Sequence, residues 1–179
     1  MSSIVALAGS PSTESRTVAL LRHIATELDD HDVQVIAVRA LPADALLGAD
    51  TTDPAISEAV KQVTDADGLI VASPVYKAAY SGVLKTFLDL LPPAALAGKA
   101  VLPVLTGAAP VHALAVDYAL RPVLAALGAR HVVSGLFLID KQIERTPTGV
   151  ALAPDVQKAV TAAVAELTTA LSAPFAVRP

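Results

Sequence analysis

Residues 68–91, "GLIVASPVYKAAYSGVLKTFLDLL", join an apolar run to a helical pattern. The run "GLIVA" (68–72) is continuously apolar, which is typical of a strand that is buried on both faces of a sheet. Residues 81–91 instead repeat apolar side chains at helical spacing, on a single face: Leu84, Phe87, Leu88 and Leu91. The stretch therefore predicts a buried strand followed by an amphipathic helix, with two of the chain's three tyrosines at the junction.

The same strand-then-helix unit repeats along the chain. Strand-like runs occupy residues 4–9, 33–41, 68–73, 100–107 and 131–139. Helical patterns cover residues 16–28, the segment that begins at Asp53–Pro54, and residues 81–91, 111–127 and 154–171. This alternation predicts an α/β fold, a parallel sheet with helices on both faces, although Pro103 is unusual inside a central strand. We expect one domain over residues 1–174 and a short tail at 175–179.

Composition narrows the range of functions. The chain has 179 residues, 54% of them hydrophobic, and a net charge of -4, which predicts a folded domain without a basic surface for nucleic acid. It has no cysteine and no histidine–carboxylate cluster with metal-ligand spacing, so thiolate chemistry is excluded and no metal site is expected. The apolar stretch 100–116 is interrupted by two prolines, and "MSSIVALAGS" lacks a basic region. We therefore expect a soluble, cytoplasmic protein without a membrane segment.

The loops after the first, third and fourth strands form the candidate site, because parallel sheets bind ligands at the carboxyl ends of their strands. The first of these loops, "GSPSTESRT" (9–17), offers five hydroxyl side chains, the guanidinium of Arg16 and the start of a helix. These features suit a phosphate group. Capping of the helix by Ser12, Thr13 or Ser15 explains the same residues, and the two interpretations are compatible.

Other phosphate motifs do not match this loop. The Gly98–Lys99 pair is followed by alanine, so it is not the end of a Walker sequence. Gly9 has no glycine partners at dinucleotide-fingerprint spacing. The first loop therefore favours a monophosphate over a nucleotide pyrophosphate.

The second and third loops favour a planar ligand. Tyr76 lies in a loop where an aromatic side chain needs a surface to cover, whereas Tyr80 is interpreted mainly as a packing residue. In "LTGAAP" (105–110), Thr106 and Gly107 allow the backbone to approach a flat ligand edge, although a simple glycine turn explains them equally well. Taken together, the loops indicate a phosphate at one end and a ring at the other, as in flavin mononucleotide (FMN).

These segments resemble a known family. "LAGSP" with "SRT", then "PVYKAAYSGVLKTFLDLLP", "VLPVLTG" and "HALAVDYALRPVLAALGA", are similar to segments of the NAD(P)H-dependent FMN reductases. Among these, the sequence is most similar to the flavin reductase of two-component alkanesulfonate monooxygenase systems. The resemblance covers roughly residues 3–140. It implies a flavodoxin-like three-layer sandwich whose five-stranded parallel sheet has the order 2-1-3-4-5.

The resemblance also implies which residues bind FMN. Around the phosphate it places Ser10, Ser15, Arg16 and Thr17. Along the isoalloxazine it places Pro74, Val75, Tyr76 and Lys77. At the ring's other edge it places Thr106, Gly107 and, where the family usually has a second glycine, Ala108.

Pro122 predicts an irregular helix over residues 114–124. A proline clashes with the carbonyl four residues back, which here belongs to Tyr118, so we expect a kink or a π-bulge close to Tyr118. The resemblance implies that this tyrosine marks a π-helical insertion at a tetramer interface beside the flavin. A Pro-kinked core helix with Tyr118 at its edge is the alternative.

The resemblance implies hydride transfer from NADPH or NADH to FMN, with reduced flavin passed to a partner monooxygenase that acts on alkanesulfonates or other sulfur compounds. The flavin supplies the chemistry, so no catalytic residue is expected, and His112 is interpreted as structural. Two alternatives remain: a reductase of quinones or azo dyes that keeps FMN bound, and a flavodoxin-like electron carrier. Helix 113–127, which carries only Asp117 and Arg121 as charged residues, favours a homo-oligomer, either a dimer or a tetramer.

Overall fold

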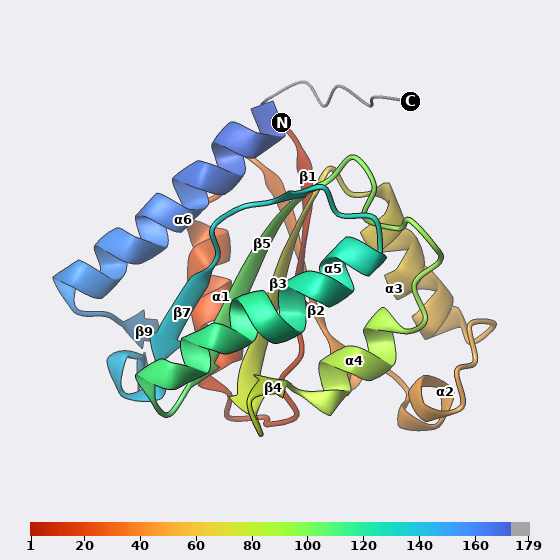
Figure 1. Cartoon of the computed structure of the whole chain (residues 1–179), viewed down its shortest axis with the longest axis horizontal. Helices are drawn as coiled ribbons and strands as arrows, with labels where there is room; N and C mark the ends of the chain where they lie inside the picture. The colour runs from red at the N-terminus through yellow and green to blue at the C-terminus, as the bar shows by residue number, and fades with distance from the viewer. Residues whose placement is uncertain (173–179) are drawn as a thin grey trace.

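The computed structural model describes residues 1–172, and a parallel sheet forms its centre. The strands are β1 (Ser3–Ala8), β2 (Asp32–Ala37), β3 (Gly68–Tyr76), β4 (Ala79–Tyr80), β5 (Ala100–Gly107), β6 (His131–Val132) and β7 (Leu136–Ile139). They lie in the order β2-β1-β3-β5-β6, with β7 beside the second half of β5 and β4 antiparallel to the end of β3 (Figure 1). The predicted class is confirmed, but the sheet has seven strands rather than five. The expected tail, 175–179, lies outside the described residues.

The extra strands arise from a hairpin and from a break. β4 is the return strand of a hairpin at the end of β3, and β6 with β7 is the strand predicted over 131–139, divided in two. The N–H of Val133 donates to the Val101 carbonyl at 3.0 Å, so the backbone groups of Val101 point toward this neighbouring strand. Because the direction alternates along a strand, the backbone groups of Pro103, two residues later, point the same way. Pro103 has no N–H to donate, and a Cβ on Gly135 would lie 2.9 Å from its ring. Pairing therefore stops at Pro103 and resumes at β7.

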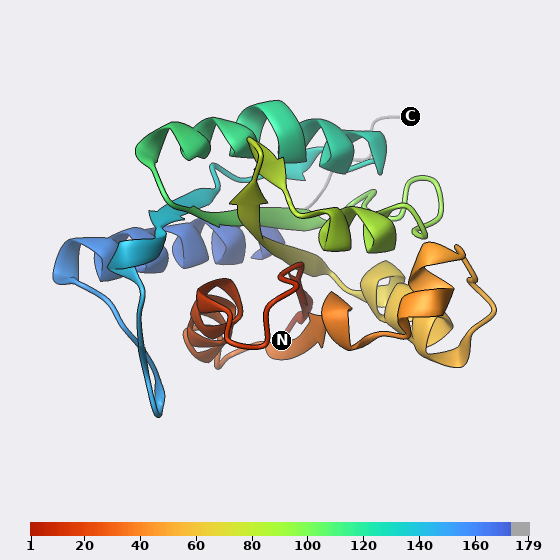
Figure 2. The ribbon, with the colours of Figure 1, turned by 90° about the horizontal axis from the view of Figure 1, so that it is seen from below.

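Helices cover both faces of the sheet. Helices α1 (Arg16–Thr26) and α6 (Pro154–Ser172) enclose one core with the sheet. On the other face lie α3 (Pro54–Asp65), α4 (Gly82–Leu88) and α5 (Arg121–Ala126), with the short α2 (Ala43–Leu47) at one end. Figure 2 shows the resulting layers edge-on. Short 3-10 turns occupy Val38–Ala40, Pro110–Ala113 and Asp140–Gln142.

Side-chain caps start the helices where the sequence predicts them. Asp53 accepts hydrogen bonds from the Ala55 and Ile56 amides at 2.9 and 3.2 Å, and Pro54 takes the first helical position. Ser15 and Ser81 cap α1 and α4 in the same way. Two of these caps lie at the carboxyl edge of the sheet, where the candidate site is expected.

The segment before α5 is a π-helix. It spans Val116–Leu120, directly before Arg121 and Pro122, and is the irregularity that Pro122 predicts. Tyr118, at its centre, is 80% exposed. A π-helix of one turn therefore presents an aromatic side chain on the surface.

A second, two-stranded sheet was not predicted. β8 (Glu144–Thr146) and β9 (Gly149–Ala151) form an antiparallel hairpin that extends from the body of the protein beside α1 (Figure 2). Among residues 1–172, no helix has the combination of length and hydrophobicity that a membrane crossing requires.

Candidate functional site

The three candidate loops meet at the carboxyl edge of the sheet and are bonded to one another. The Gly9 amide donates to the Ala72 carbonyl at 2.7 Å, and the Ser81 hydroxyl donates to the Gly9 carbonyl. The first and third loops are joined by the hydroxyls of Thr17 and Thr106, whose oxygens lie 2.7 Å apart. These segments, distant in sequence, therefore form one connected surface.

The first loop combines caps with an exposed cation. The Ser10 hydroxyl accepts from the Ser12 amide at 3.3 Å, and the Ser15 hydroxyl accepts from the Val18 amide at 3.2 Å. Both serines are buried, whereas the side chain of Arg16 is exposed. Ser15 therefore acts as the helix cap, and the guanidinium at the start of α1 is open to an anion.

A second cation lies at this loop and was not predicted from the sequence. The Arg39 Nε donates to the Pro11 carbonyl at 3.0 Å, which brings a guanidinium from the segment after β2 to the loop. No motif surrounds Arg39, and only the parallel pairing of β2 with β1 brings the two segments to the same edge. An apolar hollow of about 540 Å³ adjoins them and is lined in part by Pro11, Arg39 and Val83.

Gly9 is required for close packing between the first loop and α4. A Cβ at this position would lie 2.4 Å from the Cβ of Leu84, far inside a normal contact. Any side chain would therefore separate the loop from the helix.

The second loop is a two-residue hairpin. The strand expected over 68–73 continues to Tyr76, turns at Lys77 and Ala78, and returns as β4. These two turn residues have φ values of 51° and 65°, the left-handed pair of a type I′ turn, without a glycine at either position. Such backbone strain in a non-glycine turn is typical of functional loops.

The two tyrosines of this hairpin differ in burial. Tyr76 is 50% exposed, whereas Tyr80 is partly buried against the core. Burial raises the pKa of the Tyr80 phenol above its ordinary value. This agrees with the interpretation of Tyr80 as a packing residue. Val75 is buried, and Pro74 is partly buried.

The third loop folds back over its own glycine. A Cβ on Gly107 would lie 2.9 Å from the Nδ1 of His112, so the imidazole covers Gly107 directly. That Nδ1 is buried and has no hydrogen-bond partner among residues 1–172. Ala108 is exposed at the tip, whereas Thr106 is buried in its pair with Thr17.

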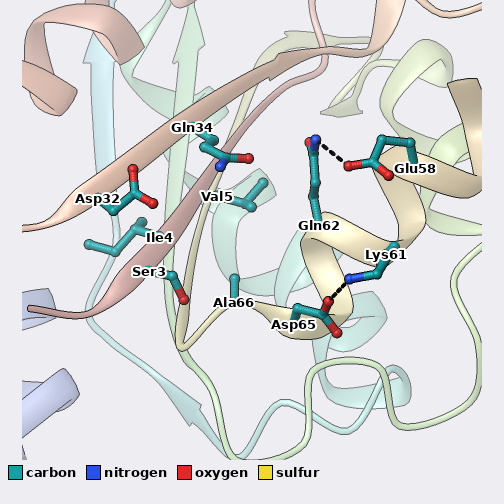
Figure 3. Close-up of a pocket in the computed structure, with 10 residues that line it drawn as sticks. All are labelled: Ser3, Ile4, Val5, Asp32, Gln34, Glu58, Lys61, Gln62, Asp65 and Ala66. Atoms are coloured by element: carbon teal, nitrogen blue, oxygen red, sulfur yellow. Dashed lines mark hydrogen bonds and ion pairs between the residues drawn. The ribbon is translucent and has the colours of Figure 1, made fainter.

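A separate hollow lies at the opposite edge of the sheet (Figure 3). It is lined by the first residues of β1 and β2 and by the end of α3. Its polar groups are largely paired: Lys61 with Asp65, and the Gln62 amide with Glu58 at 2.9 Å. Carboxylates at the amino ends of the strands make this hollow unsuitable for a flavin phosphate.

Comparison with known proteins identifies the family. The family model described as NADPH-dependent FMN reductase matches residues 2–144. The chain is 49% identical over 142 residues to "FMN reductase (NADPH)" of Pseudomonas putida, covering 78% of this chain and 72% of the relative. The protein of the same name from Escherichia coli is also 49% identical, over 78% of this chain and 74% of the relative.

One relative and one solved structure extend this comparison. The "NADH-dependent FMN reductase SfnE" of Pseudomonas putida is 34% identical, over 75% of each chain. The crystal structure of the apo form of NADH:FMN oxidoreductase (EMOB) has a TM-score of 0.90 and 42% identity, and covers 99% of this chain and 94% of that one. The fold, together with these relatives, defines a flavodoxin-like flavin enzyme. The chain belongs to the NADPH-dependent FMN reductase family and is an NAD(P)H-dependent FMN reductase.

Proposed function

We propose that the three connected loops bind FMN for hydride transfer from a nicotinamide nucleotide, and that the reduced flavin leaves for a partner monooxygenase that acts on sulfur compounds. One observation carries the proposal: Arg16 and Tyr76 are both exposed at the carboxyl edge of the sheet. Within residues 1–172 neither side chain has a hydrogen bond or an ion pair. A cation and an aromatic ring at the same edge fit a ligand that has a phosphate at one end and a flat ring system at the other.

The first loop is the proposed phosphate site. Arg16 supplies the charge, the start of α1 supplies amides, and Ser10 and Ser15 fix the loop by their own bonds. Thr17 contributes by position, because its hydroxyl is paired with Thr106.

The second and third loops are the proposed ring site. The hairpin presents Tyr76 and Lys77 from its tip, with Pro74 and Val75 behind them. Gly107 and Ala108 bring the other loop's backbone to the ring's second edge, with Thr106 anchored below. FMN, once bound, accepts hydride at its ring, and the residues of this chain bind the flavin, orient it and exclude water.

A phosphate-specific assay tests this assignment. In Arg16→Gln we expect the KM for FMN to rise about tenfold, because one charge-assisted contact is lost, with the KM for riboflavin unchanged. Riboflavin lacks the phosphate and is therefore the matched control. Equal rises for both flavins would contradict a phosphate role for Arg16.

The alternatives differ in how the flavin is used. NADPH oxidation in air that requires added FMN, by a colourless preparation, supports flavin as a substrate. A yellow protein that needs a quinone or an azo dye as acceptor would indicate a bound-flavin reductase. Absence of turnover under both conditions would indicate a carrier.

Assembly into a dimer or tetramer is part of the proposal. Tyr118 lies on the π-helix, with exposed Val111 and Leu114 on the preceding segment. Exposed apolar side chains of this size favour contact with another copy of the chain. We expect Tyr118→Asp to lower the mass measured by light scattering, with Leu47→Asp, at an exposed apolar residue of α2, as the control.

Transfer of reduced flavin defines the proposed partner. A monooxygenase that uses reduced FMN should consume its sulfur substrate when this protein, NADPH and FMN are added together. Omitting the reductase should abolish turnover, and photoreduced FMN should restore it.

A further inference from the structure

A cleft of about 480 Å³ lies between α1 and the β8–β9 hairpin. Its volume is within the range of small-molecule sites. Arg22 and His23 line it from the helix, and Arg145, Thr146 and Thr148 line it from the hairpin. The proposed FMN site does not use any of these five residues.

The cleft is cationic in an acidic protein. Among the described residues, 1–172, none that lines it carries a carboxylate, although the chain has a net charge of -4. Arg22 is exposed and, within residues 1–172, has neither a hydrogen bond nor an ion pair. Arg145 is paired with Glu14, a residue of the first loop. Arg22 therefore supplies a positive charge that no carboxylate among residues 1–172 pairs with, and such a charge attracts anionic ligands.

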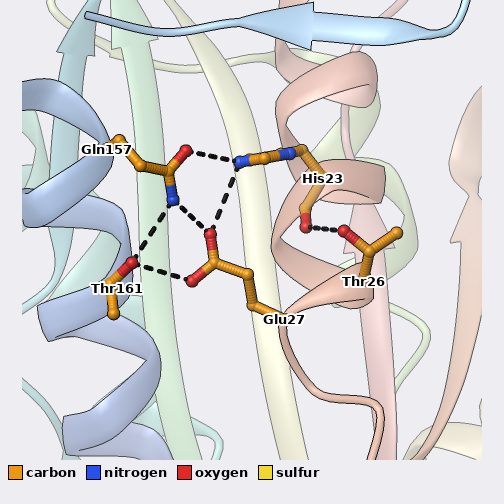
Figure 4. A network of polar contacts seen from close by, with 5 residues as sticks. All are labelled: His23, Thr26, Glu27, Gln157 and Thr161. Carbon is orange, nitrogen blue, oxygen red and sulfur yellow. Dashed lines mark hydrogen bonds and ion pairs between the residues drawn. The ribbon is translucent and has the colours of Figure 1, made fainter. Parts of the chain in front are cut away.

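The wall of the cleft is held in place by a polar network (Figure 4). The Nε2 of His23 lies 2.8 Å from the Gln157 Oε1 of α6 and 3.4 Å from the Glu27 Oε1. Thr161 of α6 donates to the other Glu27 oxygen at 3.0 Å. These contacts fix α1 against α6, so the helix presents Arg22 and His23 from a rigid surface.

The cleft continues from the proposed phosphate site. Glu14, which contacts the hairpin, directly precedes Ser15 and Arg16 at the start of α1. Arg22 follows Arg16 by six positions, which is about 9 Å along a helix. The cleft is therefore adjacent to the first loop, and a dinucleotide that extends from the flavin ring to Arg22 would pass that loop.

We propose that this cleft binds the adenosine 2′-phosphate of NADPH and so determines coenzyme preference. Arg22 and Arg145 supply guanidinium donors, which match a phosphomonoester in geometry and charge, and Thr146 and Thr148 supply hydroxyls. The inference rests on the proposed function, because it takes the flavin to lie at the three loops. It assigns to the hairpin a role in substrate recognition.

Coenzyme kinetics at saturating FMN test the proposal. In Arg22→Gln we expect the KM for NADPH to rise about tenfold, with kcat and the KM for NADH unchanged. Arg130→Gln is the control, because Arg130 is also exposed but lies before β6, at the opposite edge of the sheet. Equal rises for NADPH and NADH, or no rise for either, would overturn the proposal.

A binding experiment tests the proposed 2′-phosphate site independently of the proposed FMN reduction. By calorimetry, we expect adenosine 2′,5′-bisphosphate to bind the wild-type protein and to bind Arg22→Gln and Arg145→Gln about tenfold more weakly. AMP and inorganic phosphate serve as the comparison ligands, and we expect both to bind more weakly than the bisphosphate. This readout needs no flavin reduction, so it remains valid if the proposed function fails. Equal binding of AMP and the bisphosphate, or of wild type and the variants, would refute a 2′-phosphate site.

Discussion

Thr106→Val is expected to destabilise the protein because it leaves a buried hydroxyl without a partner. The Thr17 and Thr106 oxygens lie 2.7 Å apart, and both residues are almost fully buried. Valine keeps the shape of threonine and removes only the donor and acceptor. An unsatisfied buried hydroxyl costs about 2 kcal/mol, which for a chain of this length lowers the unfolding midpoint by about 4–8 °C.

The double variant should be more stable than either single variant. When Thr17 and Thr106 are both replaced by valine, no orphaned hydroxyl remains, and apolar replacement of both partners is nearly neutral. Because each single variant loses about 2 kcal/mol and the double variant almost none, we expect a coupling free energy of about 4 kcal/mol in magnitude in the double-mutant cycle. Urea unfolding of the four proteins, followed by circular dichroism, measures it.

Flavin kinetics of the same four proteins test whether the Thr17–Thr106 pair also positions the first and third loops for FMN. We expect the KM for FMN to rise in each single variant, because the first and third loops shift, and to recover in the double variant. Additive single effects on stability would refute the pairing argument. A KM that stays high while stability recovers would show instead that one hydroxyl contacts the flavin directly.

Two further substitutions test the packing at the amino edge of the sheet and the third loop of the site. Lys99→Met should lower the free energy of unfolding by about 1.5–3 kcal/mol, because the Lys99 ammonium donates to two carbonyls at the end of α3 at 2.7 and 2.5 Å. Urea unfolding measures this loss, and Lys61→Met, which removes an exposed lysine, is the control. Gly107→Ala should raise the KM for FMN, because its Cβ would lie 2.9 Å from His112 and displace the third loop. Gly82→Ala, where a Cβ meets no atom within 4 Å, should leave that KM unchanged, and a similar rise in both alanine variants would contradict the steric reason.

Local chemistry allowed much of the fold to be predicted. Strands that are buried on both faces are recognisable by their continuous apolar runs, as in residues 68–72. The start of α3 was predictable because Asp53 and Pro54 perform their usual roles at the first turn of a helix. The irregular helix was predictable because Pro122 cannot donate to Tyr118.

The parts that escaped prediction depend on partners distant in sequence. The β3–β4 hairpin has Lys77 and Ala78 at its turn, not the Asn-Gly or Asp-Gly pair that signals a type I′ turn. Arg39 joins the first loop only through the pairing of β1 with β2. The bond between Thr17 and Thr106 spans 89 positions, and nothing in either loop marks it.

The two prolines that disturb the regular pattern are connected in the folded protein. Pro103 interrupts the pairing between β5 and its neighbour, so the Val133 carbonyl receives no N–H from β5, and the Val132 and Ser134 carbonyls lie on either side of it. Arg121 donates to all three of them, at 3.0, 3.2 and 3.1 Å. Arg121 directly follows the π-helix that accompanies Pro122, and its guanidinium reaches the strand break while Tyr118 is exposed. Arg121 therefore connects the sheet defect to the helix defect, and it holds in place the π-helix that presents Tyr118.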